Sequence, residues 1–293
     1  MKRAPATRYD LNLAYAASLL VAIVMTIVSV AGLVDWGRVY PAIEAKMLPL
    51  FVGQDALNIV VGLPILLGSM SLARRGSLIG LLLWPGALFY VAYDYGYYVL
   101  GAPYTLFFLP YLGLVTLSMY AAVAVVVGID SATVRARLTG AVPARIVGGF
   151  LAGIALLFTT LWTALNISAA AGTAPIDPIL RVVTIMDLSL QLPALLLGGI
   201  LLWRRAPIAY VVSAGLLLQA AAYLAGLSAI TLLQEALMAT PVDPIAVFPG
   251  FLVGAIGLVF VGFFVCGAAS AATMREGLLT SAGAAQGSRP QAR

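Results

Sequence analysis

The sequence predicts an all-α fold, a polytopic bundle of about eight transmembrane helices, and three observations support this. Hydrophobic residues make up 62% of the 293 positions and charged residues only 9%, whereas soluble domains average about 25% charged residues. Apolar runs of about 20 residues or more recur along the chain, which is the length that a helix needs to cross the hydrocarbon core. The runs are continuous rather than alternating, so membrane-barrel strands are excluded as well as a soluble domain.

Glycines, prolines and charges bound the apolar runs and so delimit the expected helices. The first run follows a basic N-terminal segment, but it is too long for the apolar core of a signal peptide, so we expect it to be retained as a helix. A tail rich in Ala, Gly and Ser over 276–293 is expected to be a disordered cytoplasmic segment. The predicted spans are 12–34, 49–72, 78–100, 105–128, 146–171, 181–203, 207–233 and 246–272.

The basic residues predict the orientation in the membrane. If the N-terminus is cytoplasmic, thirteen of the sixteen Lys and Arg residues fall in cytoplasmic segments, and only Arg38, Lys46 and Arg181 do not. Short cytoplasmic loops of membrane proteins carry such an excess. We therefore expect a multi-pass protein of the cell (plasma) membrane with both termini cytoplasmic and membrane lipids as partners. The net charge of +5 then reports topology, and no nucleic-acid partner is expected.

An internal repeat is visible at an offset of 129 residues. The pattern of Leu63-Pro64 with Arg75 and Gly86 returns as Leu192-Pro193 with Arg204 and Gly215. A proline inside a span removes a backbone hydrogen bond, so kinks are expected at Pro64 and Pro193. The repeat predicts two four-helix halves, 1–130 and 131–275, related by an axis along the membrane normal.

Several short motifs resemble a family of uncharacterised bacterial polytopic integral membrane proteins. They are a helix that begins Gln54-Asp55 and reaches Pro64, the basic turn 73–78 with the sequence ARRGSL, and a second-half helix from Asp187 to Pro193 that ends in the LWRR turn at 202–205. The resemblance covers most of the chain and implies a membrane helix bundle. It carries no established activity, and therefore no site residue, over to this chain.

The residues that are absent exclude much known membrane chemistry. The chain has no histidine, which removes bis-histidine haem ligation, the common zinc sites and histidine acid–base catalysis. The single cysteine, Cys266, cannot form an intramolecular disulfide. No nucleotide-binding glycine loop and no serine nucleophile with a base is present. We therefore expect no cofactor, no metal and no catalytic residue.

Three carboxylates inside predicted spans are the strongest candidates for a functional site. Asp55, Asp94 and Asp187 are expected at similar depth in the outer leaflet, and ionisable residues inside a bilayer are costly and frequently functional. Helical spacing places amides one turn from two of them, and Asn166 near the outer end of the fifth span. The candidate ligand-binding residues are Asp55, Asn58, Tyr90, Asp94, Asn166, Asp187 and Gln191. The competing interpretation is that the aspartates make structural hydrogen bonds and that the tyrosines form an interfacial aromatic belt.

Three classes of function remain open from the sequence. We expect a non-enzymatic protein that binds or transports a small solute, an ion or a lipid headgroup through an outward-facing polar cavity. The second class is a structural or sensory subunit whose helix faces contact a membrane protein partner. The third is a lipid-acting membrane enzyme with carboxylates as acid–base groups. Convergence of the three aspartates would favour the first class.

Overall fold

The predicted all-α membrane bundle is confirmed. The computed structural model describes residues 6–41, 43–45, 47–173, 175–237 and 244–287. Within these ranges the chain is helical with no β-strand, and eight helices are long and apolar enough to span a membrane. These helices agree with the predicted spans to within a few residues at most ends.

Each half of the chain includes a span that is interrupted by a π-helical turn. The elements of the first half are α1 (Asn12–Val34), α2 (Trp36–Val39), α3 (Leu48–Leu57), the π turn η1 (Asn58–Gly62), α4 (Leu63–Arg74), α5 (Leu78–Gly101) and α6 (Phe108–Gly128). Those of the second half are α7 (Ser131–Leu138), α8 (Ala144–Ala170), α9 (Pro178–Met186), the π turn η2 (Asp187–Gln191), α10 (Leu192–Trp203), α11 (Pro207–Leu237) and α12 (Pro244–Gly287).

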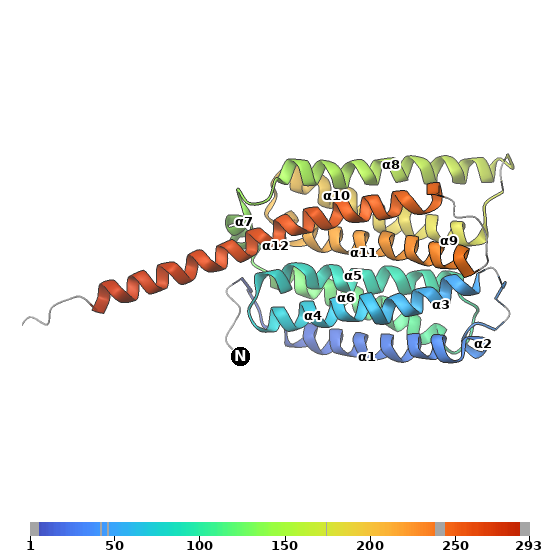
Figure 1. Ribbon diagram of the computed structural model, residues 1–293, viewed down its shortest axis with the longest axis horizontal. Coiled ribbons are helices and arrows are strands. Elements are labelled where there is room, and N and C mark those ends of the chain that lie inside the picture. The colour runs from blue at the N-terminus through green and yellow to red at the C-terminus, as the bar shows by residue number, and fades with distance from the viewer. Residues whose placement is uncertain (1–5, 42, 46, 174, 238–243, 288–293) are drawn as a thin grey trace, which may run out of the picture.

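The two sets of helices lie side by side, with α5 and α11 packed together at the boundary between them (Figure 1). The first turn of α1 and the far end of α12 lie at the same end of the bundle, as an even number of crossings requires. We call this the arginine-rich end, because α4 and α10 run into Arg74-Arg75 and Arg204-Arg205 there. The short helix α2 and the start of α9 mark the opposite end.

Helix α5 is the central helix of the bundle. In the most apolar 18-residue stretch of α5, 83% of the residues are buried, whereas the corresponding share in each of the other seven spans is 39% or less. Its tyrosines, including Tyr90, Tyr93, Tyr95 and Tyr98, are all buried. They therefore lie in the protein interior rather than in an interfacial aromatic belt, and their hydroxyls need partners there.

Each predicted proline kink is preceded by a π-helical turn. Pro64 and Pro193 are the second residues of α4 and α10, directly after η1 and η2. Proline lacks an N–H and its ring displaces the carbonyl four residues earlier, which is where the helix widens to π geometry. The two π turns have the same length and are separated by the offset of 129 residues.

Other structural features recur at the same offset. The turn after α4 contains Gly76 at φ 82°, and the turn after α10 contains Arg205 at φ 57°, the one non-glycine residue with positive φ in the described chain. The residue that ends each π turn packs on the following long helix: Gly62 against Tyr90, and Gln191 against Gln219. The duplication that the sequence predicts is consistent with these recurrences and, like the axis relating the halves, stays a prediction.

The end of α12 differs from the expected disorder of 276–293. The helix continues through Gly287 and leaves the bundle beyond the arginine-rich end (Figure 1). Ala and Leu, which are frequent in this segment, have high helix propensity, and no proline interrupts the segment before Pro290. Residues 288–293 lie outside the described chain.

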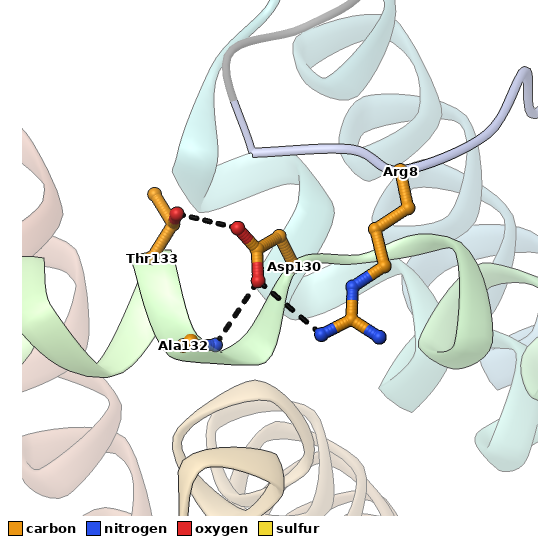
Figure 2. A network of polar contacts seen from close by, with 4 residues as sticks. All are labelled: Arg8, Asp130, Ala132 and Thr133. Carbon is orange, nitrogen blue, oxygen red and sulfur yellow. Dashed lines mark hydrogen bonds and ion pairs between the residues drawn. The ribbon is translucent and has the colours of Figure 1, made fainter.

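The N-terminal segment is held against the loop between α6 and α7 (Figure 2). The Arg8 amide donates to the Gly128 carbonyl at 2.7 Å and the Asp130 amide to the Ala6 carbonyl at 2.8 Å. Asp130 also caps α7, since its carboxylate accepts from the Ala132 amide and the Thr133 hydroxyl, and it pairs with the Arg8 guanidinium at 3.4 Å. One exposed carboxylate thus joins the N-terminus to α7.

We expect this contact to weaken in acid. The Thr133 hydroxyl, helped by Arg8, holds the pKa of Asp130 below its ordinary value of 3.8. A lowered pKa stabilises the folded arrangement above the ordinary pKa, and this stability is lost as pH falls through the lowered pKa. The protection factor of the Arg8 amide, which is the intrinsic exchange rate at the same pH divided by the observed rate, should therefore fall in Asp130→Asn at neutral pH and in the wild type in strong acid. Asp35→Asn is the control, and unchanged protection in Asp130→Asn would contradict the expectation.

Candidate functional site

The predicted site residues occupy two separate places on opposite sides of α5. Asp55, Asn58, Tyr90 and Asp94 meet inside the first half. Asp187 and Gln191 lie in the second half.

Asp55 is held by two phenols. The Tyr40 hydroxyl donates to its Oδ2 at 2.5 Å and the Tyr98 hydroxyl to its Oδ1 at 3.1 Å. The carboxylate fits because α1 carries glycine opposite it: a Cβ on Gly32 would collide with Asp55 Oδ2 and with the Tyr40 hydroxyl. Asp55 is completely buried, so both donors act in a medium of low dielectric constant, where hydrogen bonds are strong.

Asp94 and Asn58 form the second part of this group, which we call the first-half cluster (Asp55, Asn58, Asp94 and the polar side chains bonded to them). The Asn58 amide donates to Asp94 Oδ2 at 2.7 Å and lies 3.4 Å from the Tyr95 hydroxyl. Tyr95 in turn bonds to Ser29 of α1 at 2.8 Å. The Tyr95 and Tyr98 rings stack at 5.2 Å between centroids, which joins the Asp94 and Asp55 sites.

Tyr90 borders the cluster through Gln54, whose amide donates to the Tyr90 hydroxyl at 3.3 Å. Asp55, Asn58 and Asp94 have no exposed surface, and Gln54 and Tyr90 have 5% or less. The first-half cluster is therefore a closed polar interior, not the open polar cavity that we expected from the sequence.

Asp187 is the first residue of the π turn η2 and is partly buried. The Tyr93 hydroxyl donates to its Oδ1 and the Trp162 indole to its Oδ2, both at 2.7 Å. These donors come from α5 and α8, so one carboxylate ties the central helix to an outer helix of the second half. The Tyr93 ring also meets Tyr223 of α11 edge to face at 4.7 Å.

Asp187 faces a cavity of about 700 Å³ in the second half, which we call the second-half cavity. Its walls come mainly from α8 to α12, with Leu50 of α3 and Tyr93 of α5, and are mostly aliphatic and aromatic. Toward the α2–α9 end it reaches Leu50, Asp177 and Gln234, and on the opposite side it is bordered by Phe150, whose ring meets Phe260 of α12 at 4.9 Å. The polar side chains near its middle are Tyr93, Trp162, Asp187 and Gln191.

Two predicted residues contribute differently from the rest. Gln191 lines the cavity and its amide donates to the Gln219 carbonyl oxygen at 2.7 Å. Asn166 donates to the Trp162 carbonyl in its own helix at 2.8 Å, so its side chain bonds within α8. The three aspartates thus lie around α5 in two groups rather than in one site.

Three side chains that bond to the predicted site residues were not predicted from the sequence: Tyr40, Trp162 and Gln219. Gln219 had a usable signal, because it is the repeat equivalent of Tyr90 at the offset of 129 residues. Tyr40 lies in a loop and Trp162 near the middle of α8, and neither position carries a periodic pattern that would single it out.

The fold and these buried polar groups define the chain as a multi-pass membrane protein with an enclosed carboxylate cluster and a separate cavity. Within the described ranges no three His, Cys, Asp or Glu residues are grouped as a metal site would require. Comparison of the chain with family models, with curated proteins and with solved structures gave no match.

Proposed function

We propose that this membrane protein binds an amphipathic small molecule with a cationic, hydrogen-bond-donating head in the second-half cavity. The observation that supports the proposal is a cavity of about 700 Å³ with mainly apolar walls and the Asp187 carboxylate on one side. Ligand pockets commonly measure about 300–1,000 Å³, with apolar walls and a few polar groups that fix orientation.

The carboxylate determines which head group would fit. Asp187 accepts one hydrogen bond on each oxygen, from Tyr93 and from Trp162, and a carboxylate has about four acceptor positions. An ammonium head would therefore find free acceptor positions, whereas an anionic head would be repelled. The apolar walls favour an alkyl or aromatic body over a hydrophilic solute or a bare ion.

We also propose the membrane orientation. The thirteen-to-three asymmetry of basic residues supports cytoplasmic termini, and the end of the cavity near Asp177 would then face the opposite, outer side. Reporter fusions after Pro103 and at the C-terminus should report opposite sides of the membrane. A C-terminus on the outer side would refute this orientation.

The binding proposal is tested with dodecylamine, dodecanol and dodecanoate as probes of one chain length. The purified protein in maltoside detergent should be stabilised against thermal unfolding most by the amine, less by the alcohol and least by the acid. Asp187→Asn should abolish the preference for the amine, because the carboxamide no longer attracts a cation.

Asp55→Asn is the matched control, since Asp55 also accepts one side-chain hydrogen bond on each oxygen but does not line the cavity. This variant should keep the amine preference. Equal shifts by all three probes in the wild type, or an amine preference that survives Asp187→Asn, would overturn the proposal.

A further inference from the structure

The buried pair of Asn58 and Asp94 is one hydrogen short of complete pairing. Asp94 Oδ2 accepts from the Asn58 amide at 2.7 Å. The other oxygens of the same two groups, Asp94 Oδ1 and Asn58 Oδ1, have no hydrogen-bond partner among the described residues, although both side chains are completely buried. Buried polar atoms without partners are rare and call for an explanation.

A single proton would satisfy both atoms. A carboxylic acid and a carboxamide can pair through two hydrogen bonds, from the amide N–H to the acid C=O and from the acid O–H to the amide oxygen. The first of these is present. A proton on Asp94 Oδ1, donated to Asn58 Oδ1, would supply the second. An ionised Asp94 would instead leave these two buried oxygens without a hydrogen between them, and a buried charge beside the neutral amides of Asn58 and Gln54.

Among the described residues, no positively charged group is found to interact with Asp94. The ionisable groups that interact with it are Asp55 of α3, Tyr90, Tyr95, Tyr97 and Tyr98 of α5, Tyr111 of α6 and Tyr223 of α11. None of these is a lysine or an arginine. Asp55 already accepts from two phenols, so it is satisfied as a carboxylate, and two neighbouring acids in an apolar interior do not both ionise readily.

We propose that Asn58 and Asp94 form a proton-binding site, with the proton on Asp94 Oδ1 and shared with Asn58 Oδ1. The site lies on α5 beside Tyr93, which reaches Asp187 on the other side of the helix. The protein thus holds one exchangeable proton at its centre, which is the element that a proton-coupled membrane protein requires. This inference depends on the first-half cluster alone and not on any ligand of the second-half cavity.

Infrared spectroscopy tests the proposal directly. The wild-type protein, purified in a maltoside detergent that contains no ester, should show the C=O stretch of a protonated carboxylic acid at neutral pH, and the band should move to lower wavenumber in D2O. Asp94→Asn should remove the band, while Asp55→Asn should leave it in place. Absence of the band in the wild type, or its survival in Asp94→Asn, would overturn the proposal.

Stability measurements separate a proton from a metal cation at the same oxygens. Asp94→Asn keeps one donor and one acceptor facing Asn58, so its thermal midpoint should match that of the wild type, whereas Asp94→Leu should lower it. Replacing choline chloride by sodium chloride at constant ionic strength should not change the wild-type midpoint. If sodium stabilises the wild type but not Asp94→Asn, the site binds a sodium ion rather than a proton, and the proposal is overturned.

If the Asp94→Asn protein cannot be produced in folded form, Asn58→Leu tests the proposal instead. Without the amide oxygen, the acid O–H loses its acceptor, and the C=O stretch should move to higher wavenumber than in the wild type. A band at an unchanged position in Asn58→Leu would place the proton elsewhere and refute the shared site.

Discussion

Replacing Gly86 by valine should prevent the two halves of the bundle from packing. A Cβ at Gly86 would overlap the Gly215 carbonyl oxygen and Cα, and a Cβ at Gly215 would lie 2.7 Å from the Gly86 nitrogen. Helices α5 and α11 therefore touch backbone to backbone, as small residues permit in membranes. Backbone atoms cannot move aside as side chains do, so we expect destabilisation of about 3 kcal/mol, the upper end for overpacking, and a large loss of folded yield.

Gly113→Val and Gly153→Val are the matched controls, because both glycines lie inside long helices and a Cβ at either would have no neighbour within 4 Å. These variants should retain most of the folded yield. Size-exclusion profiles and thermal midpoints in detergent provide the measurement. A Gly86→Val protein as stable as the controls would show that α5 and α11 do not make this contact.

Removing both hydrogen-bond donors to Asp187 should destabilise the protein more than the sum of the single changes. Tyr93→Phe and Trp162→Phe each leave one donor on the carboxylate, whereas the double variant leaves a partly buried charge with neither. Hydrogen bonds to charged groups contribute about 1.5–3 kcal/mol each. Two independent bonds would therefore contribute about 3–6 kcal/mol, and we expect the double variant to lose more than this because the two donors act on one carboxylate.

Unfolding in mixed detergent micelles, followed for the four proteins of the double-mutant cycle, measures this coupling. Tyr120→Phe and Trp36→Phe are the controls, since these side chains are 74% and 52% exposed and should change stability little. Strictly additive effects at Tyr93 and Trp162 would contradict joint action on one carboxylate.

Helix α5 makes contacts with both halves of the bundle. Its Gly86 contacts α11, its Tyr93 bonds to Asp187 of the second half, and its Asp94 bonds to Asn58 of the first. Two adjacent residues of α5 thus face different sites: Asp94 faces the first-half cluster and Tyr93 faces the second-half cavity. A change in the position of α5 would act on both sites at once.

The sequence by itself determined the class of fold and the approximate bounds of the eight spans, apart from the extension of α12 to Gly287. Continuous apolar runs require a bilayer, and backbone groups inside it must pair within each helix, so composition and run length sufficed to predict eight spans. The sequence also located both irregular turns through Pro64 and Pro193, because proline disrupts a helix by a local covalent effect. The sequence showed Gly86 and Gly215 as equivalent positions of the repeat, but it did not predict that these two glycines contact each other.

The tertiary structure decided how the polar residues are grouped. The sequence predicts one depth for Asp55, Asp94 and Asp187, but depth does not specify direction around a helix axis. The packing of α5 between the halves directs Tyr93 and Asp94 to different sides. Partners such as Tyr40, Trp162 and Gln219 come from positions far along the chain. Such pairings follow from the angles and distances between helices, which side-chain packing sets and local sequence does not encode.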